Sequence, residues 1–424
     1  MNYTRAIQLL YGHQKFGANL GLKTPRRLAA LMGDPQVQLR FIHVAGTNGK
    51  GSTCAMLESI YRGAGLRVGL FTSPHLVSFR ERIQVNGAAI GEADVARLIG
   101  EMEPLLAGFP YGAAPTFFEV VTVLGLRFFA EQRCDLVILE TGLGGRLDAT
   151  NIVTPLASVI TNIALEHQQW LGDTVAQIAA EKAGIIKPNV PVVTATAEIA
   201  ALRVIEETAA RLGAPMTCVT SATAMFSANA EPALPLLGEH QQLNAALAAA
   251  TVRVLQGKIP VDDDTIRRGL ETVSWPGRLQ LVKLSDGRRL LLDGAHNAAG
   301  IEALCAALLR HFPEERPALV FGMLADKDWP AMARTLAPLA SRIVTVPVSS
   351  DRTVSAADLA AVCREVNPAI ETAGSLNEAL QWTQKDRFIV VTGSLYLIGE
   401  ALELLGLLPS AGGERELNEW KKNT

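Results

Sequence analysis

The chain has 424 residues, of which 49% are hydrophobic and 19% charged, and its formal net charge is −3. This length suits two or three domains, and the apolar content excludes an intrinsically disordered protein. The slight negative charge disfavours binding along a nucleic-acid backbone, and no stretch is apolar for long enough to be a membrane span or a signal peptide.

Short apolar strands alternate with amphipathic helices through the first two thirds of the chain. The predicted strands are Phe41–Ala45, Arg67–Thr72, Cys134–Glu140, Ala157–Asn162 and Pro191–Thr196. The predicted helices are Ser52–Gly63, Glu92–Leu106, Phe117–Gln132, Thr174–Ala183 and Ile199–Leu212. This alternation predicts an α/β domain over residues 1–276 with a mostly parallel sheet, covered by helices on both faces.

The pattern restarts after Trp275-Pro276-Gly277, where proline and glycine break the preceding helix. A hairpin is predicted from Leu279–Leu284 and Arg288–Leu292, and further strands from Pro317–Phe321, Arg342–Val346 and Phe388–Val391. These elements predict a smaller, Rossmann-like α/β domain over residues 277–424. The polar tail Ser410–Thr424 is expected to be a loosely packed end.

A glycine-rich turn joins the first strand to the first helix of this pattern. It reads Gly46-Thr47-Asn48-Gly49-Lys50-Gly51-Ser52-Thr53. Glycines let backbone N–H groups surround phosphate oxygens, and the helix N-terminus adds partial positive charge. A lysine can reach the outer phosphates, and a following hydroxyl can bind Mg²⁺. The segment predicts a P-loop for ATP, although Val44 stands where the first glycine of the general motif belongs and Gly51 is an extra residue. An ordinary glycine-rich turn is the alternative.

The loop resembles that of the Mur ligase superfamily, and the extra Gly51 resembles its folylpolyglutamate synthase and dihydrofolate synthase branch. The resemblance continues through Thr72-Ser73-Pro74-His75-Leu76, Glu81-Arg82-Ile83, Thr116-Phe117-Phe118-Glu119, Glu140 to Asn151, Glu166-His167, Glu181-Lys182-Ala183-Gly184, Pro276-Gly277-Arg278 and Asp293-Gly294-Ala295-His296-Asn297. These blocks follow the family order over most of the chain. The resemblance implies that ATP phosphorylates a carboxylate and that the amine of glutamate attacks the acyl phosphate.

Two Mg²⁺ ions are implied by the same resemblance, because charge must be neutralised when two anions meet. Ser52 would bind the first ion, and Ser73 and His167 would share the second with Glu140. Glu140 also ends a predicted strand, where ligands bind in parallel sheets, although it could merely cap the next turn. The family carries a carboxylated lysine at Lys182, which from composition alone reads as a surface lysine. We interpret Asp148 as a turn residue and Glu166 as a helix-entry acid.

Further roles follow from the resemblance. Asn244 is expected to contact adenine, Arg278 a phosphate and Asp293 the ribose side, while His296 would lie near the reacting groups together with Lys50 and Lys182. Residues Thr116, Phe117, Phe118, Glu119 and Leu147 would contact pteroate. The two phenylalanines could stack on its flat rings or simply pack in the core. Residues 72–76 and 81–83 would form a loop that closes to exclude water.

The implied activity is the addition of L-glutamate to dihydropteroate and of further γ-linked glutamates to reduced folate. Two alternatives stay open: a peptidoglycan Mur ligase acting on a UDP-MurNAc substrate, and a nucleotide-binding switch without ligase chemistry. Five scattered cysteines without a CxxC pair predict reduced thiols. We therefore expect a cytoplasmic monomer with small-molecule partners only. The residues that bind glutamate cannot be named from the sequence.

Overall fold

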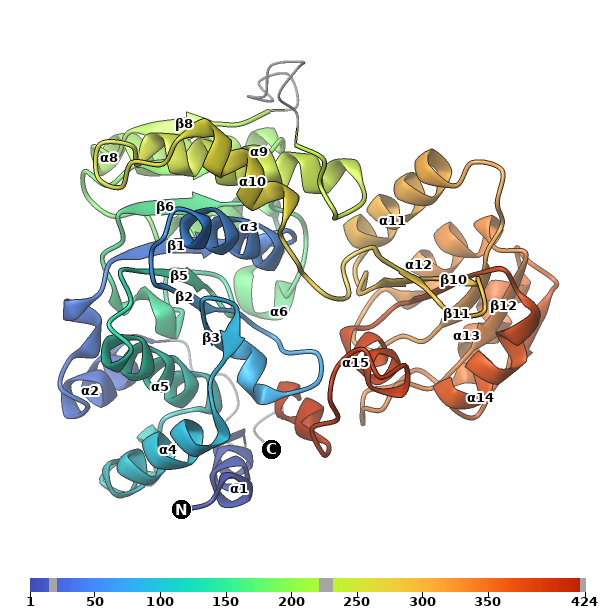
Figure 1. Ribbon diagram of the computed structural model, residues 1–424, viewed down its shortest axis with the longest axis horizontal. Coiled ribbons are helices and arrows are strands. Elements are labelled where there is room, and N and C mark those ends of the chain that lie inside the picture. The colour runs from blue at the N-terminus through green and yellow to red at the C-terminus, as the bar shows by residue number, and fades with distance from the viewer. Residues whose placement is uncertain (15–20, 221–231, 420–424) are drawn as a thin grey trace.

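The computed structural model describes residues 1–14, 21–220 and 232–419, and Figure 1 presents the fold. Two sheets stand side by side, each with helices on both faces. An N-terminal part contains the larger sheet and a C-terminal part the smaller one. Within the described residues, no helix is long and apolar enough to cross a membrane.

The larger sheet has eight strands in the order β4-β3-β2-β5-β1-β6-β7-β8. They are β1 (Phe41–Ala45), β2 (Val68–Phe71), β3 (Ile83–Val85), β4 (Ala88–Ala89), β5 (Leu136–Glu140), β6 (Ala157–Ile160), β7 (Val192–Thr194) and β8 (Met216–Cys218). All neighbouring pairs are parallel except β2–β3 and β3–β4 at one edge, so that β3 alone runs against the other strands. The central strands β1 and β5 are buried along their whole length, as expected for a sheet covered on both faces.

Helices of the N-terminal part cover both faces of this sheet. They are α1 (Tyr3–Gln14), α2 (Lys23–Leu31), α3 (Lys50–Gly63), α4 (Glu92–Ala107), α5 (Phe117–Glu131), α6 (Gln168–Leu171), α7 (Val175–Ala183), α8 (Ile199–Arg211), α9 (Glu239–Val254) and α10 (Asp263–Glu271). One apolar core lies between the sheet and α3, α9 and α10, and another packs α1, α2, α4 and α5 on the opposite face. The sheet therefore holds the loops at its strand ends rigidly.

The smaller sheet has six strands in the order β13-β12-β11-β14-β10-β9. They are β9 (Gln280–Lys283), β10 (Arg289–Asp293), β11 (Ala318–Phe321), β12 (Arg342–Thr345), β13 (Ile370–Thr372) and β14 (Phe388–Thr392). Its helices are α11 (Ala298–His311), α12 (Trp329–Leu336), α13 (Ala356–Arg364), α14 (Leu376–Trp382) and α15 (Leu395–Leu404). Only the β9–β10 hairpin is antiparallel. The predicted fold class and hairpin are thus confirmed.

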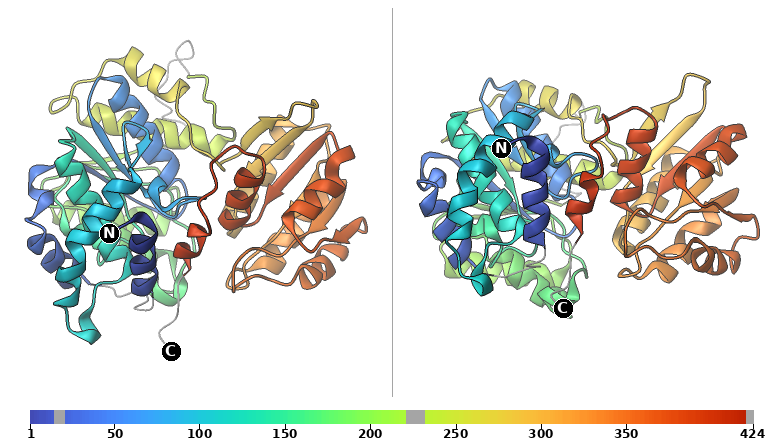
Figure 2. Two further views of the ribbon diagram at one scale, coloured as in Figure 1. Left: turned by 60° about the horizontal axis from the view of Figure 1, so that its bottom comes forward. Right: turned by 90° about the horizontal axis from the view of Figure 1, so that it is seen from below.

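The chain passes between the two sheets in the link from α10 to β9, and the predicted boundary at 276/277 falls within this link. The domain bounds 1–276 and 277–424 stay a prediction. The carboxyl-terminal segment, although it follows the smaller sheet in sequence, returns to the N-terminal part. Figure 2 shows this segment, in red, lying between the two parts.

The expectation of a loosely packed tail is wrong for Gly413–Glu419, whereas residues 420–424 lie outside the described residues. This C-terminal segment contains the 3-10 helix η8 (Glu414–Asn418), in which Glu414, Leu417 and Asn418 are buried. The Glu414 carboxylate accepts hydrogen bonds from the Tyr3 hydroxyl at 2.9 Å and the Phe79 amide at 2.7 Å. Polar composition misled the prediction, because these polar groups find partners far away in the sequence.

Replacing Leu417 with alanine is expected to lower the free energy of unfolding by roughly 2–5 kcal/mol. The Leu417 side chain is 2% exposed and packs in the core between α1, α4 and α5, so truncation leaves a cavity. Urea denaturation of the purified protein measures the change. Leu407 is 40% exposed, and Leu407→Ala should change stability by no more than about 0.5 kcal/mol. Equal stability of the two variants would contradict the observed packing of the segment.

Candidate active site

A cavity of about 780 Å³ lies between the two parts of the molecule. Its N-terminal wall includes the loop after β1, the end of β5 and the start of α5. Its C-terminal wall includes Arg278, His296 and Tyr396. Because β1 and β5 are parallel neighbours, their carboxyl ends meet at the edge where ligands bind in such sheets.

The glycine-rich loop has the backbone shape that its composition predicts. Gly46 and Gly49 have φ angles of 152° and 86°, which favour glycine. A Cβ at Gly46 would lie 1.8 Å from Thr161 Oγ1, and one at Gly49 would lie 2.5 Å from Asn244 Oδ1. Helix α3 begins at Lys50, two residues earlier than predicted, so its first-turn amides adjoin the loop. The loop is therefore shaped to bind an anion with its main chain.

The extra glycine of the loop is explained by a close contact. A Cβ at Gly51 would lie 2.8 Å from the indole ring of Trp275. Any side chain there would displace the indole of Trp275, next to the predicted boundary between the parts. Sequence reasoning identified Gly51 as unusual but could not supply this reason.

Lys50 lies over the loop that it follows. Its ammonium donates hydrogen bonds to the carbonyl oxygens of Gly46 at 3.1 Å and Thr47 at 3.0 Å. Thr47, Asn48, Gly49, Lys50, Gly51 and Ser52 all line the cavity. Thr53 does not, because its side chain is fully buried beneath the loop. The prediction that Thr53 contributes directly to nucleotide binding therefore has no support in its position.

Glu140 is a buried carboxylate at the end of β5, and it lines the cavity. Burial raises its pKa, and the Lys50 ammonium opposes that rise. Its only hydrogen bond recorded among the described residues comes from the Ser73 amide, at 3.0 Å from Oε2. A buried carboxylate without an ion-pair partner is costly unless it takes up a proton or binds a cation. The site therefore fits a divalent cation.

The other predicted metal ligands line the same cavity. These are Ser52, Ser73 and His167. Burial lowers the pKa of His167 to about 4, which leaves its imidazole neutral near pH 7. Across residues 1–14, 21–220 and 232–419, no three His, Cys, Asp or Glu side chains gather as a metal cage. Mg²⁺ commonly uses one or two protein oxygens together with phosphates and water.

Lys182 is buried near the C-terminal end of α7 and is not a surface lysine. Its ammonium donates to the Gly46 carbonyl oxygen at 2.6 Å, directly behind the glycine-rich loop. Burial, reinforced by the nearby Lys50 charge, lowers the pKa of Lys182 to about 7. A large fraction of this amine is therefore uncharged near neutral pH. Neither Gly46 nor Lys182 lines the cavity itself.

Four predicted ligand residues come from α9 and the C-terminal part, and all line the cavity: Asn244, Arg278, Asp293 and His296. The Asp293 carboxylate accepts hydrogen bonds from the Leu279 amide at 2.9 Å and the Ala295 amide at 3.0 Å. Asp293 therefore also holds the turn after β10. Its contact with a ribose stays a prediction, as do the roles of the other three.

The predicted pteroate residues form another stretch of cavity wall. Thr116 and Glu119 are engaged in a capping box at the start of α5, with the Thr116 amide 2.7 Å from Glu119 Oε2. The Phe118 ring lies over Gly142, where a Cβ would approach the ring to 2.5 Å. Phe117 is buried in the core and also lines the cavity, and the half-buried Phe118 faces both core and cavity. Leu147 is also half-buried at the cavity.

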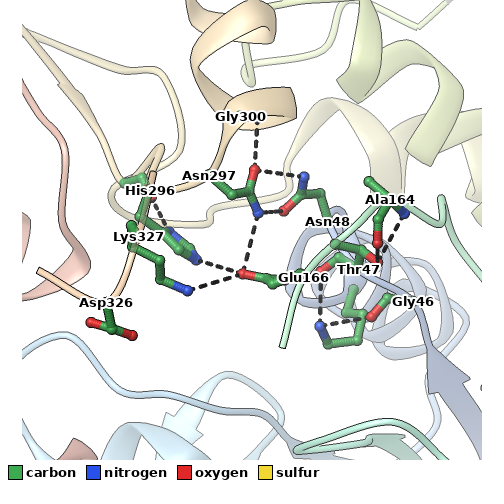
Figure 3. A network of polar contacts seen from close by, with 12 residues as sticks. Gly46, Thr47, Asn48, Ala164, Glu166, His296, Asn297, Gly300, Asp326 and Lys327 are labelled. Atoms are coloured by element: carbon green, nitrogen blue, oxygen red, sulfur yellow. Dashed lines mark hydrogen bonds and ion pairs between the residues drawn. The ribbon is translucent and has the colours of Figure 1, made fainter. Parts of the chain in front are cut away.

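Glu166 joins the two parts of the molecule beside the phosphate loop (Figure 3). Its Oε1 lies 3.4 Å from Lys327 Nζ and 3.7 Å from His296 Nε2. The Asn48 and Asn297 side-chain amides also exchange hydrogen bonds, at 3.1 and 2.9 Å. Our interpretation of Glu166 as a helix-entry acid is wrong, because its carboxylate is directed to the C-terminal part.

Lys327 was missed, although it follows β11 and strand ends of this kind are a usable signal. Asp148 was correctly read as a turn residue: its carboxylate accepts from the Gly142, Leu143 and Thr150 amides.

Comparison with known proteins gives a consistent result over most of the chain. The Mur ligase middle domain matches residues 44–252, and the Mur ligase glutamate ligase domain matches residues 277–395. The dihydrofolate synthase/folylpolyglutamate synthase of Bacillus subtilis is 37% identical, with 94% of this chain and 98% of that protein covered. The protein of the same description from Escherichia coli is 34% identical, with 93% of each covered.

Solved structures agree with these matches. Folylpolyglutamate synthase from Thermotoga maritima has a TM-score of 0.86 and 33% identity, with 98% of this chain and 99% of that one covered. Escherichia coli FolC in complex with DHPP and ADP has a TM-score of 0.84 and 32% identity, with 96% and 98% covered. The chain therefore belongs to the folylpolyglutamate synthase and dihydrofolate synthase family of the Mur ligase superfamily.

Proposed function

We propose that this protein is an ATP-dependent ligase that joins L-glutamate to dihydropteroate and adds further γ-linked glutamates to reduced folates. One observation carries the proposal: the phosphate loop, the buried carboxylate Glu140 and the predicted pteroate wall line a single cavity. A triphosphate at the loop and an organic acid at the wall would meet beside Glu140. Relatives with ADP or DHPP bound support both ligands.

Negative charge has to be neutralised at each reaction step, and residues of the cavity could do this. Main-chain amides of the loop and the Lys50 ammonium would balance the triphosphate while the acceptor carboxylate attacks its outer phosphorus. Ser52, Ser73, Glu140 and His167 would hold two Mg²⁺ ions, which supply further neutralisation. The glutamate amine then attacks the acyl phosphate and releases phosphate. His296 and Arg278 would act from the opposite wall, next to the reacting groups and the phosphates. We place this activity in the cytoplasm, in a monomer.

We further propose that Lys182 is carboxylated. A carbamate forms when an uncharged amine attacks CO₂, and the lowered pKa of Lys182 provides such an amine near neutral pH. The product is an anion, whereas Lys182 Nζ now lies 2.6 Å from the Gly46 carbonyl oxygen. Since the two negative groups would repel each other, this contact must rearrange when the carbamate forms. The new carboxylate would support the second metal from behind the loop.

The carbamate is expected to accumulate as pH rises through about 7, because the uncharged fraction of Lys182 increases there. Incubation with ¹³C-bicarbonate at pH 8 should give a carbamate carbon signal in NMR spectra. Lys182→Arg should abolish the signal. Lys187→Arg should retain it, since Lys187 instead hydrogen-bonds Asn151. Density ending at the side-chain nitrogen in crystals grown with bicarbonate at alkaline pH would count against carboxylation.

The reaction is tested by phosphate release with ATP, Mg²⁺ and glutamate and with the acceptor varied. Release that needs both glutamate and dihydropteroate supports the synthase activity, and release with tetrahydrofolate supports γ-glutamyl addition. Mass spectrometry of the products counts the glutamates. Release with nucleotide alone would favour a switch, and release only with a UDP-MurNAc acceptor would favour a peptidoglycan ligase.

A further inference from the structure

The C-terminal segment does more than pack against the N-terminal part. After its buried residues Leu417 and Asn418, the chain reaches back to the C-terminal part with Glu419. Leu417, Asn418 and Glu419 all line the cavity between the parts. The last described residue of the chain is thus part of the active-site wall.

The Glu419 carboxylate is held by side chains of the C-terminal part. Arg352 Nε donates to Oε2 at 2.8 Å, and the Ser350 hydroxyl donates to Oε1. Both carboxylate oxygens are therefore engaged, and the Glu419 side chain is only 13% exposed. A guanidinium and a hydroxyl that converge on one carboxylate form a recognisable carboxylate site.

Arg352 carries more negative charge around it than one guanidinium balances. Its Nη1 lies 3.2 Å from both oxygens of Asp326, and its Nη2 lies 3.3 Å from the Tyr396 hydroxyl. If Glu419 leaves and another carboxylate enters, Asp326 and Tyr396 remain and the net charge of the site is unchanged. Such an exchange has no cost from an unpaired guanidinium.

The C-terminal segment can release Glu419 without coming loose. Asn418 hydrogen-bonds Arg82 at 2.6 Å and the His75 carbonyl oxygen at 2.9 Å. Glu414 adds its bonds to Tyr3 and Phe79. These anchors precede Glu419 and lie on the N-terminal part, so a rotation of the Glu419 side chain vacates Arg352 while the anchors stay in place.

Arg352 lies on the same cavity wall as residues that contact the phosphate-loop region. Asp326 adjoins Lys327, whose ammonium contacts Glu166 beside the phosphate loop, and Figure 3 shows Asp326 on the far side of Lys327 from Glu166. All four residues line the cavity. A carboxylate on Arg352 would thus belong to a molecule that also reaches toward the loop.

We propose that Arg352 and Ser350 form a binding site for a substrate carboxylate, which Glu419 occupies as an internal competitor until substrate displaces it. This rests on the proposed function, which supplies two sources of the ligand: free glutamate, and the γ-glutamyl end of a folate that already carries glutamate. Both present the same carboxylate chemistry to a guanidinium.

The kinetic test compares Glu419→Gln with Glu416→Gln, a matched control because Glu416 is exposed in the same segment. We expect Glu419→Gln to lower the KM of one carboxylate substrate three- to tenfold, and Glu416→Gln to behave as wild type. Arg352→Met should raise the same KM more than tenfold and abolish any effect of Glu419→Gln added to it. A KM for Glu419→Gln that equals the control, or rises, overturns the proposal.

Two acceptors separate the sources of the carboxylate. With dihydropteroate, which has no glutamyl group, a fall in the KM of glutamate alone assigns the site to free glutamate. With mono- and diglutamyl tetrahydrofolate at saturating glutamate, a KM that falls for the acceptors alone assigns the site to the γ-glutamyl end. Either pattern supports the site.

A binding measurement separates this proposal from the proposed function. L-Glutamate and γ-glutamylglutamate are titrated calorimetrically into wild type, Glu419→Gln and Glu416→Gln without ATP. Tighter binding of either ligand to Glu419→Gln than to the control supports the site even if wild type ligates no acceptor. If wild type is active but Glu419→Gln changes neither binding nor any KM, the ligase stands and the carboxylate site is refuted.

Discussion

Replacing Lys50 with alanine is expected to reduce kcat by at least ~10²–10³-fold, the usual effect of removing one charge-stabilising group from a water-excluded site. Lys50 is the lysine of the glycine-rich loop, and its ammonium already lies 3.0 Å from the Thr47 carbonyl oxygen at the cavity. Without it, the loop loses its lysine cation, which would balance the negative charge that shifts between ATP and the acceptor. Phosphate release at saturating ATP, glutamate and dihydropteroate measures the loss.

Two controls make the Lys50 result interpretable. Lys258→Ala removes an exposed lysine remote from the cavity and should retain the wild-type rate. Thermal unfolding of Lys50→Ala should resemble that of wild type, because among the described residues the ammonium hydrogen-bonds only to two carbonyl groups of its own loop. A near-normal rate for Lys50→Ala would refute its assigned role.

Glu140→Ala and Glu140→Gln should each reduce turnover by about two orders of magnitude or more, since both remove a buried charge assigned to Mg²⁺. The glutamine variant keeps the shape and can still accept the hydrogen bond from the Ser73 amide. It therefore isolates the charge from the packing. Activity should recover in part at raised Mg²⁺, so the Mg²⁺ concentration for half-maximal rate is the decisive measurement.

The matched control for Glu140 is Glu207→Ala, which removes an exposed carboxylate from α8. It should change neither the rate nor the Mg²⁺ dependence. An unchanged Mg²⁺ requirement in Glu140→Gln, together with a normal rate, would show that the carboxylate serves only the local fold.

Most of the two sheets could be predicted from the sequence because their signals are local. Strand β1 coincides with its prediction, and several others differ by one or two residues at their ends. The short strands β3, β4, β8 and β13 were missed. Each has only two or three residues, too few for a period of alternating burial to appear.

Site residues could be predicted where a motif within one short segment indicates their chemical role. Glu140 and the glycine-rich loop are placed as expected at adjacent strand ends. Lys327 and Arg352 were missed because their meaning depends on partners more than 60 residues away, Glu166 and Glu419. Thr53 shows what a motif leaves open: it belongs to the glycine-rich loop, yet helix α3 turns its side chain into the core.

The returning C-terminal segment also constrains motion. The chain crosses between the two parts twice, in the link before β9 and again after α15. A single covalent connection would leave the two parts free to rotate relative to each other in any direction. Two crossings restrain the parts at two places, so we expect any opening of the cavity to be closer to a rotation about the line that joins the crossings.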